Sequence, residues 1–234
     1  MDSLTHFRSM DESTPAEWAL IARSTQGDTA GAADQALAML QRLKGASLCM
    51  PVDPLEHSLQ TATRAFKDGA DEETVVCALL HDIGDLMAPL NHAEFAASIL
   101  RPYVSAENHG VVLLHEIFQG YHYFDKVGLD RNLRDRFRGH PSFEKAARFC
   151  ERWDQAAFDK DYQSMPLGEF EPMLRRVLGR ALHGESDAAC RLYGLPHQHD
   201  AGRGQPWRML SAASIRAMPA ARRAASARSC SGSG

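Results

Sequence analysis

Cysteine is scarce in this sequence of 234 residues, and its spacing fits neither disulfides nor a zinc site. The five cysteines are odd in number, widely separated and free of any CxxC pair: Cys49, Cys77, Cys150, Cys190 and Cys230. Disulfide frameworks use an even set of cysteines, and thiolate zinc sites use closely spaced pairs. We therefore expect reduced thiols, which are typical of a cytoplasmic protein.

Long hydrophobic runs are also missing. None approaches the roughly 18 apolar residues that a membrane-spanning helix needs. The first residues, MDSLTHFRSMDES, are polar and acidic, and they lack the basic and apolar segments of a secretory leader. We expect a cytoplasmic protein that does not associate with a membrane.

Positive charge is sparse outside the last part of the chain. The formal net charge is −4, but residues 201–234 hold six arginines and no Asp, Glu or Lys, so residues 1–200 carry −10. An acidic body argues against a nucleic-acid groove. A small molecule is therefore the expected partner, and the sequence leaves the oligomeric state open.

Strand signals are absent, because no short alternating runs of Val, Ile and Thr lie between turn residues. Helix signals recur instead, such as Asp53 before Pro54 and Asp71 before an acidic first turn. The sequence predicts an all-α fold with helices over residues 14–25, 30–45, 53–69 and 71–83, helices that start at Asn91 and Ser105, and helices near 130–138, 142–158 and 169–180.

Length and composition favour one core domain with extensions. A chain of this length with 44% hydrophobic residues can build one sizeable core. We expect residues 1–29 to form an N-terminal helical extension and residues 30–183 to form the domain. Residues 184–234 are rich in Ala, Arg, Ser and Gly with poor periodicity, which predicts a loosely ordered basic tail.

The stretch VCALLHDIGD places His81 and Asp82 together at the end of an apolar helix. An unpaired buried charge costs several kcal/mol, so a metal ion is the expected partner. Further candidate ligands lie on separate predicted helices: His57, His92, His115 and Asp154. Imidazole and carboxylate together suit Fe, Mn or Zn, and a carboxylate can bridge two ions. Six ligands are too many for one catalytic ion that keeps an open position.

These residues carry a resemblance to the HD-domain superfamily. Its pattern of His, His-Asp and a distant Asp is met by His57, by His81-Asp82 and by Asp154 in WDQAAFD, with the second histidine 24 positions after the first. The resemblance spans roughly residues 30–180. It implies an HD-domain helical bundle with a dinuclear metal centre in its core.

Within the superfamily the chain resembles the mixed-valent di-iron oxygenases, which include myo-inositol oxygenase and the phosphonate-cleaving HD oxygenases. Their two additional histidines can be matched by His92 and His115. The resemblance implies one iron held by His57, His81 and Asp154 and a second held by His92 and His115. Asp82 then bridges the Fe(II)/Fe(III) pair and is the candidate catalytic residue. O2 is the implied co-substrate, and a C–C or C–P bond beside a hydroxyl of a small polar substrate is cleaved.

Two other functions remain open. The same superfamily contains metal-dependent phosphohydrolases that act on nucleotides or small phosphate esters. Many of these, like the inositol oxygenase, carry a lysine three residues after the bridging aspartate, where this chain has Asp85. A negative charge there suits a phosphate poorly. A catalytically silent scaffold that binds a partner through its tail is the third hypothesis, although all six ligand positions are filled.

Substrate-binding candidates follow from the same comparison. Phosphonate-cleaving relatives carry a lysine where this chain has Gln119, and their Tyr/Glu-bearing loop reads SLCMPVDP here, which argues against a phosphonate substrate. The aromatic residues Phe118, Tyr121, Tyr123 and Phe124, with Asp85, could surround an organic cation such as a quaternary ammonium. Polar residues nearby could hold the ligands in place or bind a carboxylate: His122, Asp125, Arg131, Arg138 and His140. The substrate-binding set is therefore Asp85, Gln119, Tyr121, His122 and Arg138.

Overall fold

The computed structural model describes residues 5–27, 29–46 and 48–180, and these residues contain helices and no strand. The prediction of an all-α fold is confirmed. The α-helices are α1 (Pro15–Gly27), α2 (Thr29–Leu43), α3 (Pro54–Lys67), α4 (Glu72–Leu80), α5 (His92–Leu100), α6 (Ala106–Gln119), α7 (Phe143–Phe149) and α8 (Leu167–Leu178). The shorter elements are the 3-10 helices η1 (Met10–Glu12), η2 (Gly120–His122), η3 (Phe124–Val127) and η4 (Arg131–Phe137), and the π-helical turn η5 (Cys150–Asp154).

Three of the helices that lead to the candidate ligands begin at side-chain caps. Asp53 accepts a hydrogen bond from the backbone amide of Glu56, and Pro54 is the first helical residue of α3. Asp71 caps α4 and Ser105 caps α6 in the same manner. A capping side chain satisfies an amide that the first helical turn leaves without a partner. These helix starts are therefore encoded locally, as the sequence predicted.

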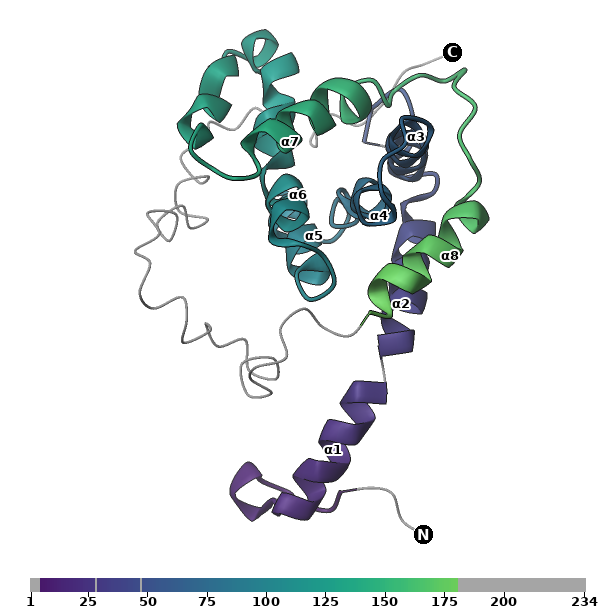
Figure 1. Cartoon of the computed structure of the whole chain (residues 1–234), viewed down its shortest axis with the longest axis vertical. Coiled ribbons are helices and arrows are strands. Elements are labelled where there is room, and N and C mark those ends of the chain that lie inside the picture. Colours follow the sequence, from purple (N-terminus) through teal and green to yellow (C-terminus); the bar gives the residue numbers. More distant parts are fainter. Residues whose placement is uncertain (1–4, 28, 47, 181–234) are drawn as a thin grey trace, which may run out of the picture.

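The core lies between two helix pairs and the helices that cover them. In Figure 1, α3 packs on α4 and α5 on α6, while α7 crosses beside α6 and α8 runs along α2. The nine residues of α4 include seven buried ones, so this helix is central. α8 has one apolar face that contains Phe170, Leu174 and Val177, all fully buried. Each such side chain contributes about 1.5–3 kcal/mol when it leaves water.

The N-terminal helix lies apart from this core. Figure 1 shows α1 extending away from the helices that carry the candidate ligands. The predicted division into residues 1–29, 30–183 and 184–234 stays a prediction. The whole predicted tail lies outside the described residues, as do residues 181–183. No helix in the described ranges has the length and apolar character needed to cross a membrane.

Two predicted helices take a different form from the one expected. Residues 130–138 contain the 3-10 helix η4 rather than an α-helix. The helix predicted over 142–158 is α-helical only to Phe149, and the amide of Gln155 then bonds the carbonyl of Cys150, five residues back. A π-turn of this kind inserts one residue into the helix and is frequent at functional sites. Here it ends at Asp154.

Candidate metal centre

Six ionisable side chains from five segments of the chain meet in the core. His57 lies in the first turn of α3, His81 and Asp82 directly follow α4, and His92 begins α5. The other two are His115 in the last turn of α6 and Asp154 at the end of η5. The four histidines and Asp154 are each at most 5% exposed, and the Asp82 side chain is 14% exposed. Such burial of polar groups needs partners inside the protein.

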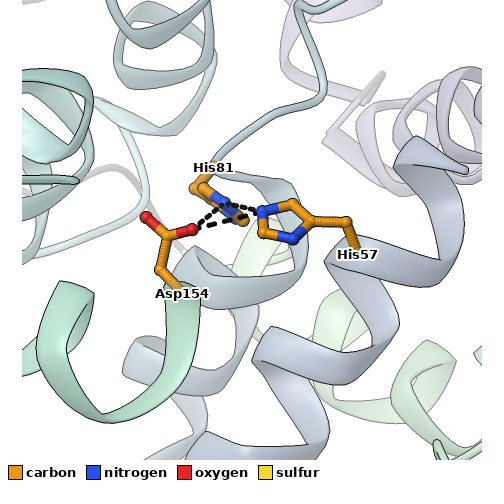
Figure 2. Close-up of side chains that lie close together, drawn as sticks. All are labelled: His57, His81 and Asp154. Carbon is orange, nitrogen blue, oxygen red and sulfur yellow. Dashed lines mark hydrogen bonds and ion pairs between the residues drawn. The ribbon is translucent and has the colours of Figure 1, made fainter. Parts of the chain in front are cut away.

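One half of this six-residue cluster consists of His57, His81 and Asp154. Figure 2 shows the three side chains converging, with His57 projecting from its helix toward the other two. The His57 Nε2 lies 3.2 Å from His81 Nε2 and 3.2 Å from Asp154 Oδ1. His81 Nε2 is 3.7 Å from the same carboxylate oxygen. The three ligand atoms therefore surround a common point.

The other half contains His92 and His115, and Asp82 joins the two halves. The Nε2 atoms of His92 and His115 are 3.3 Å apart. Asp82 Oδ1 lies 3.2 Å from His92 and 3.0 Å from His115. Its second oxygen, Oδ2, lies 3.3 Å from both His57 and His81. Each oxygen of this carboxylate thus faces a different histidine pair.

Backbone carbonyls orient three of the four imidazoles. The Nδ1 atoms of His57, His81 and His115 lie 3.0, 2.8 and 2.7 Å from the carbonyl oxygens of Ala157, Ala78 and Val112. A carbonyl only accepts, so Nδ1 carries the proton and Nε2 turns its lone pair toward the cluster. Metal-binding histidines are held in this manner in proteins.

The donor atoms fit bound metal. Two Nε2 lone pairs that face each other repel unless a proton or a cation lies between them. Metal–nitrogen and metal–oxygen bonds near 2.1 Å place neighbouring ligands of one ion about 3 Å apart. The distances of 3.0–3.7 Å within each half agree with this spacing. The cluster can therefore hold metal, and its two halves could each take one ion.

The carboxylates shift the protonation of the histidines strongly. Burial disfavours the charged form of His57, but hydrogen bonds to Asp154 and Asp82 outweigh it and raise the pKa of His57 to about 9. Burial likewise opposes charge on His81, and the carboxylates raise its pKa well above the usual value. Burial disfavours the ionised forms of Asp82 and Asp154 too, yet the histidines lower both pKa values. In the metal-free protein, protons occupy positions that a metal ion would take.

Two predicted substrate-binding residues touch the cluster directly. Asp85 Oδ1 lies 3.6 Å from the Nδ1 of His92, where the other three histidines have a backbone carbonyl. The amide nitrogen of Gln119 donates to Asp154 Oδ1 at 2.9 Å. Both side chains can thus fix the orientation of a candidate ligand. Their predicted role toward the substrate stays a prediction.

The other three predicted substrate-binding residues are placed differently. His122 has its Nε2 buried, and burial together with the charge of Arg134 lowers the pKa of this imidazole, although the Asp154 carboxylate acts in the opposite direction. Tyr121 contacts His122 edge to face, with ring centroids 5.4 Å apart. Arg138 is not brought into the cluster, since its side chain is 70% exposed and pairs with Asp135 on the surface.

Three of the four aromatic residues that the sequence suggested for binding an organic cation are engaged in other contacts. Phe118 is fully buried and packs on Phe143 and Phe137. Phe124 is 4% exposed. The face of Tyr121 is covered by arginine side chains rather than left for a ligand cation. These three rings contact other side chains of the protein. The sequence alone could not distinguish aromatic residues that pack in this way from aromatic residues that line a pocket.

A comparison with known proteins finds distant similarity to a dioxygenase. The chain is 25% identical over 162 residues to the [1-hydroxy-2-(trimethylamino)ethyl]phosphonate dioxygenase (glycine-betaine-forming) of Leisingera caerulea. The match covers 56% of this chain and 81% of that relative. The chain therefore has a distant relative among the dioxygenases. No protein-family model matches the chain.

Sequence reasoning missed several contacts that shape the centre. The ring of Phe158 stacks on His57 with centroids 4.4 Å apart, and Phe149 meets His81 edge to face at 5.6 Å. Phe158 stands four residues after Asp154 in the motif WDQAAFD, so its proximity to the ligand was a usable signal. The carbonyl of Ala157, in the same motif, carries no sequence signal because any residue supplies one.

Proposed function

We propose that this chain is an HD-domain di-iron oxygenase. It uses O2 to cleave a C–C or C–P bond beside a hydroxyl group in a small polar substrate. His57, His81 and Asp154 hold one iron, His92 and His115 hold the other, and Asp82 bridges the two. The protein acts on a small molecule rather than on nucleic acid or a membrane, and a cytoplasmic location remains our prediction.

The placement of Asp82 carries this proposal. Its Oδ2 faces one histidine pair and its Oδ1 faces the other, all at 3.0–3.3 Å. A carboxylate that bound a single ion would not need to lie close to four imidazole nitrogens. The arrangement supports two ions joined by one carboxylate.

The distant relative supports an oxidative reaction over hydrolysis. Its name describes a dioxygenase whose substrate bears a hydroxyl on the carbon of a C–P bond and whose product is glycine betaine. The six ligand positions alone also suit a phosphohydrolase, so the redox state of the metal decides between the two. An iron pair would supply oxygen activation and one-electron chemistry that the side chains cannot.

The residues of the chain provide geometry and a dry environment. The carbonyls of Ala157, Ala78 and Val112 keep three imidazoles in the tautomer that presents Nε2. Phe149 and Phe158 cover His81 and His57. Apolar walls exclude water from the ligands and limit side reactions. Asp82, the more exposed carboxylate, is the ligand that a substrate would approach.

Metal analysis with electron paramagnetic resonance tests the proposal. The protein is purified without oxygen, and its iron content is measured. An oxygenase of this kind should contain two irons and give a spin-half signal from a coupled Fe(II)/Fe(III) pair. A redox-inert metal, together with phosphate release from nucleotides, would instead establish the hydrolase.

A further inference from the structure

The imidazole of His92 lies between two carboxylates that come from one turn. Asp82 Oδ1 is 3.2 Å from its Nε2, and Asp85 Oδ1 is 3.6 Å from its Nδ1. The two ring nitrogens point away from each other, so the carboxylates approach the ring from different sides. Asp82 therefore lies on the side where metal would bind, and Asp85 lies behind the ring.

The turn that follows α4 brings both carboxylates to His92. The amide of Asp85 donates to the carbonyl oxygen of Asp82 at 3.0 Å, and the amide of Ala88 donates to that of Gly84 at 2.7 Å. Gly84 permits a close approach, because a Cβ atom there would lie 3.1 Å from both the Cα and the carbonyl oxygen of His92. The turn is thereby held against the start of α5.

Asp85 differs from the groups behind the other three imidazoles of the cluster. Those rings face backbone carbonyls, which are neutral, whereas Asp85 presents a carboxylate. The 3.6 Å separation is longer than a hydrogen bond, so the attraction between Asp85 and the ring is electrostatic. A negative charge on this side favours the tautomer with its proton on Nδ1, which leaves Nε2 to bind metal. It also makes the ring a stronger metal ligand.

The half of the cluster that contains His92 is the one with fewer donors. Among the described residues, the half with Asp154 offers an ion four donor atoms, because Asp82 Oδ2 joins two histidines and a carboxylate. The half with His92 offers two imidazoles and Asp82 Oδ1. Fewer donors and less negative charge weaken the binding of a cation. A carboxylate behind His92 offsets part of this difference.

We infer that Asp85 is a positioning residue that holds His92 from behind and strengthens metal binding by the half of the cluster containing His92 and His115. This inference rests on the proposed function, because it requires that each half binds one ion. It gives Asp85 a role toward the metal centre, whereas the sequence predicted a role toward the substrate.

Titration with Co²⁺ tests the inference through binding alone. The metal-free protein is titrated in competition with a chromophoric chelator, and the visible absorption of bound Co²⁺ follows each ion. The His92→Ala protein, which keeps the other half, shows which Kd and spectrum belong to each half. Asp85→Ala should raise the Kd of the ion at His92 about 10–100-fold and leave the other Kd within about twofold. Asp85→Asn keeps an acceptor oxygen without the charge and should give an intermediate Kd.

Glu94→Gln is the matched control, because it also removes one negative charge close to His92 in the sequence, in the first turn of α5. Residues two positions apart on a helix do not face the same side, so both Kd values should stay within about twofold of the parent. All variants should keep the circular dichroism of the parent. An unchanged Kd for the ion at His92 in Asp85→Ala, equal weakening of both ions, or the same loss in Glu94→Gln would overturn the inference.

The titration needs neither oxygen nor iron, so its result is separate from the test of the oxygenase. A protein that shows the expected Kd changes but lacks an Fe(II)/Fe(III) pair would contradict the oxygenase proposal and support this inference. A parent protein that binds a single Co²⁺ ion would overturn both.

Discussion

Among single residues, Asp82 is the side chain on which both halves of the cluster depend. It directly follows α4, and its oxygens reach four imidazoles that come from α3, α5, α6 and the end of α4 itself. No other carboxylate in the described residues occupies this central position: Asp154 faces only His57 and His81. Removing one or the other should therefore have different consequences.

If the proposed two-ion assignment holds, replacement of Asp82 by Ala should remove both metal ions, because each half of the cluster loses an oxygen ligand. His92→Ala should lose chiefly the ion of the second half and keep the ion bound by His57, His81 and Asp154. Metal content per protein, measured by mass spectrometry of the digested sample, checks both expectations. His109→Ala is the control, because this α6 histidine lies outside the six-residue cluster. An Asp82→Ala variant with the metal content of the parent would remove the bridging assignment.

Metal affinity should rise with pH between about 6 and 9. The pKa of His57 is raised to about 9 in the metal-free protein, so its imidazole is protonated below that pH. A metal ion must displace this proton to bind. Competition between the proton and the metal ion therefore weakens as the pH rises, and it ends only above the pKa of His57 in the folded protein. Titration of metal in buffers of different ionisation enthalpy should show proton release at pH 7. Metal binding with no proton uptake or release at that pH would contradict this assignment.

At the scale of secondary structure, α6 depends on a close approach at Gly110. A Cβ atom there would run into Ser142 Oγ and lie 2.9 Å from His140 Cε1. Gly110 is buried within α6, five residues before the candidate ligand His115 in the same helix. The missing side chain lets the segment before α7 pack directly on α6. The packing of α6 on α7 fixes the position of His115 relative to Asp154.

Gly110→Ala should lower the free energy of unfolding by about 1–3 kcal/mol, since overpacking forces the backbones apart. Gly168→Ala in α8 is the matched control, because a Cβ there meets nothing within 4 Å. That variant should be unchanged or more stable by up to about 1 kcal/mol, because alanine favours the helix. Urea denaturation of the parent and both variants provides the measurement. Equal stability of the two variants would show that the α6–α7 contact tolerates an extra atom.

On the scale of the whole molecule, the cluster ties together helices that are far apart in sequence. Its candidate ligands run from His57 to Asp154, and α3, α5, α6 and η5 each supply one, while two follow α4. A bound metal therefore stabilises the fold as a set of cross-links. Ligand binding to the folded state alone raises stability with metal concentration.

Metal removal by a chelator should lower the thermal midpoint by about 5–10 °C. Metal at 100 times its Kd adds about 2.7 kcal/mol, and each kcal/mol shifts the midpoint of a chain this long by about 2–4 °C. Differential scanning calorimetry before and after chelation, and after metal is returned, gives the shift. The Asp82→Ala protein should show almost none. If the chelator does not change the thermal midpoint of the parent protein, the result would argue against a tightly bound metal.

Much of the fold could be predicted from local signals. Helices begin at Asp53, Asp71 and Ser105 because the side-chain oxygen of each accepts a hydrogen bond from the backbone amide three residues later. Such an interaction depends only on residues that are close in the sequence. The form of residues 130–138 and 150–154 was missed, since 3-10 and π turns respond to packing rather than to composition. The placement of Tyr121 beneath two arginines was missed for the same reason.

The sequence by itself determined that the protein is helical, where most of its helices begin, and which residue types were available to bind metal. These properties depend on residues a few positions apart in the chain, so they can be predicted from the sequence. Only the tertiary structure decided that four histidines turn Nε2 toward Asp82, that Gln119 holds Asp154, and that Arg138 stays at the surface. Each of these contacts joins residues whose distance in space depends on how whole helices pack.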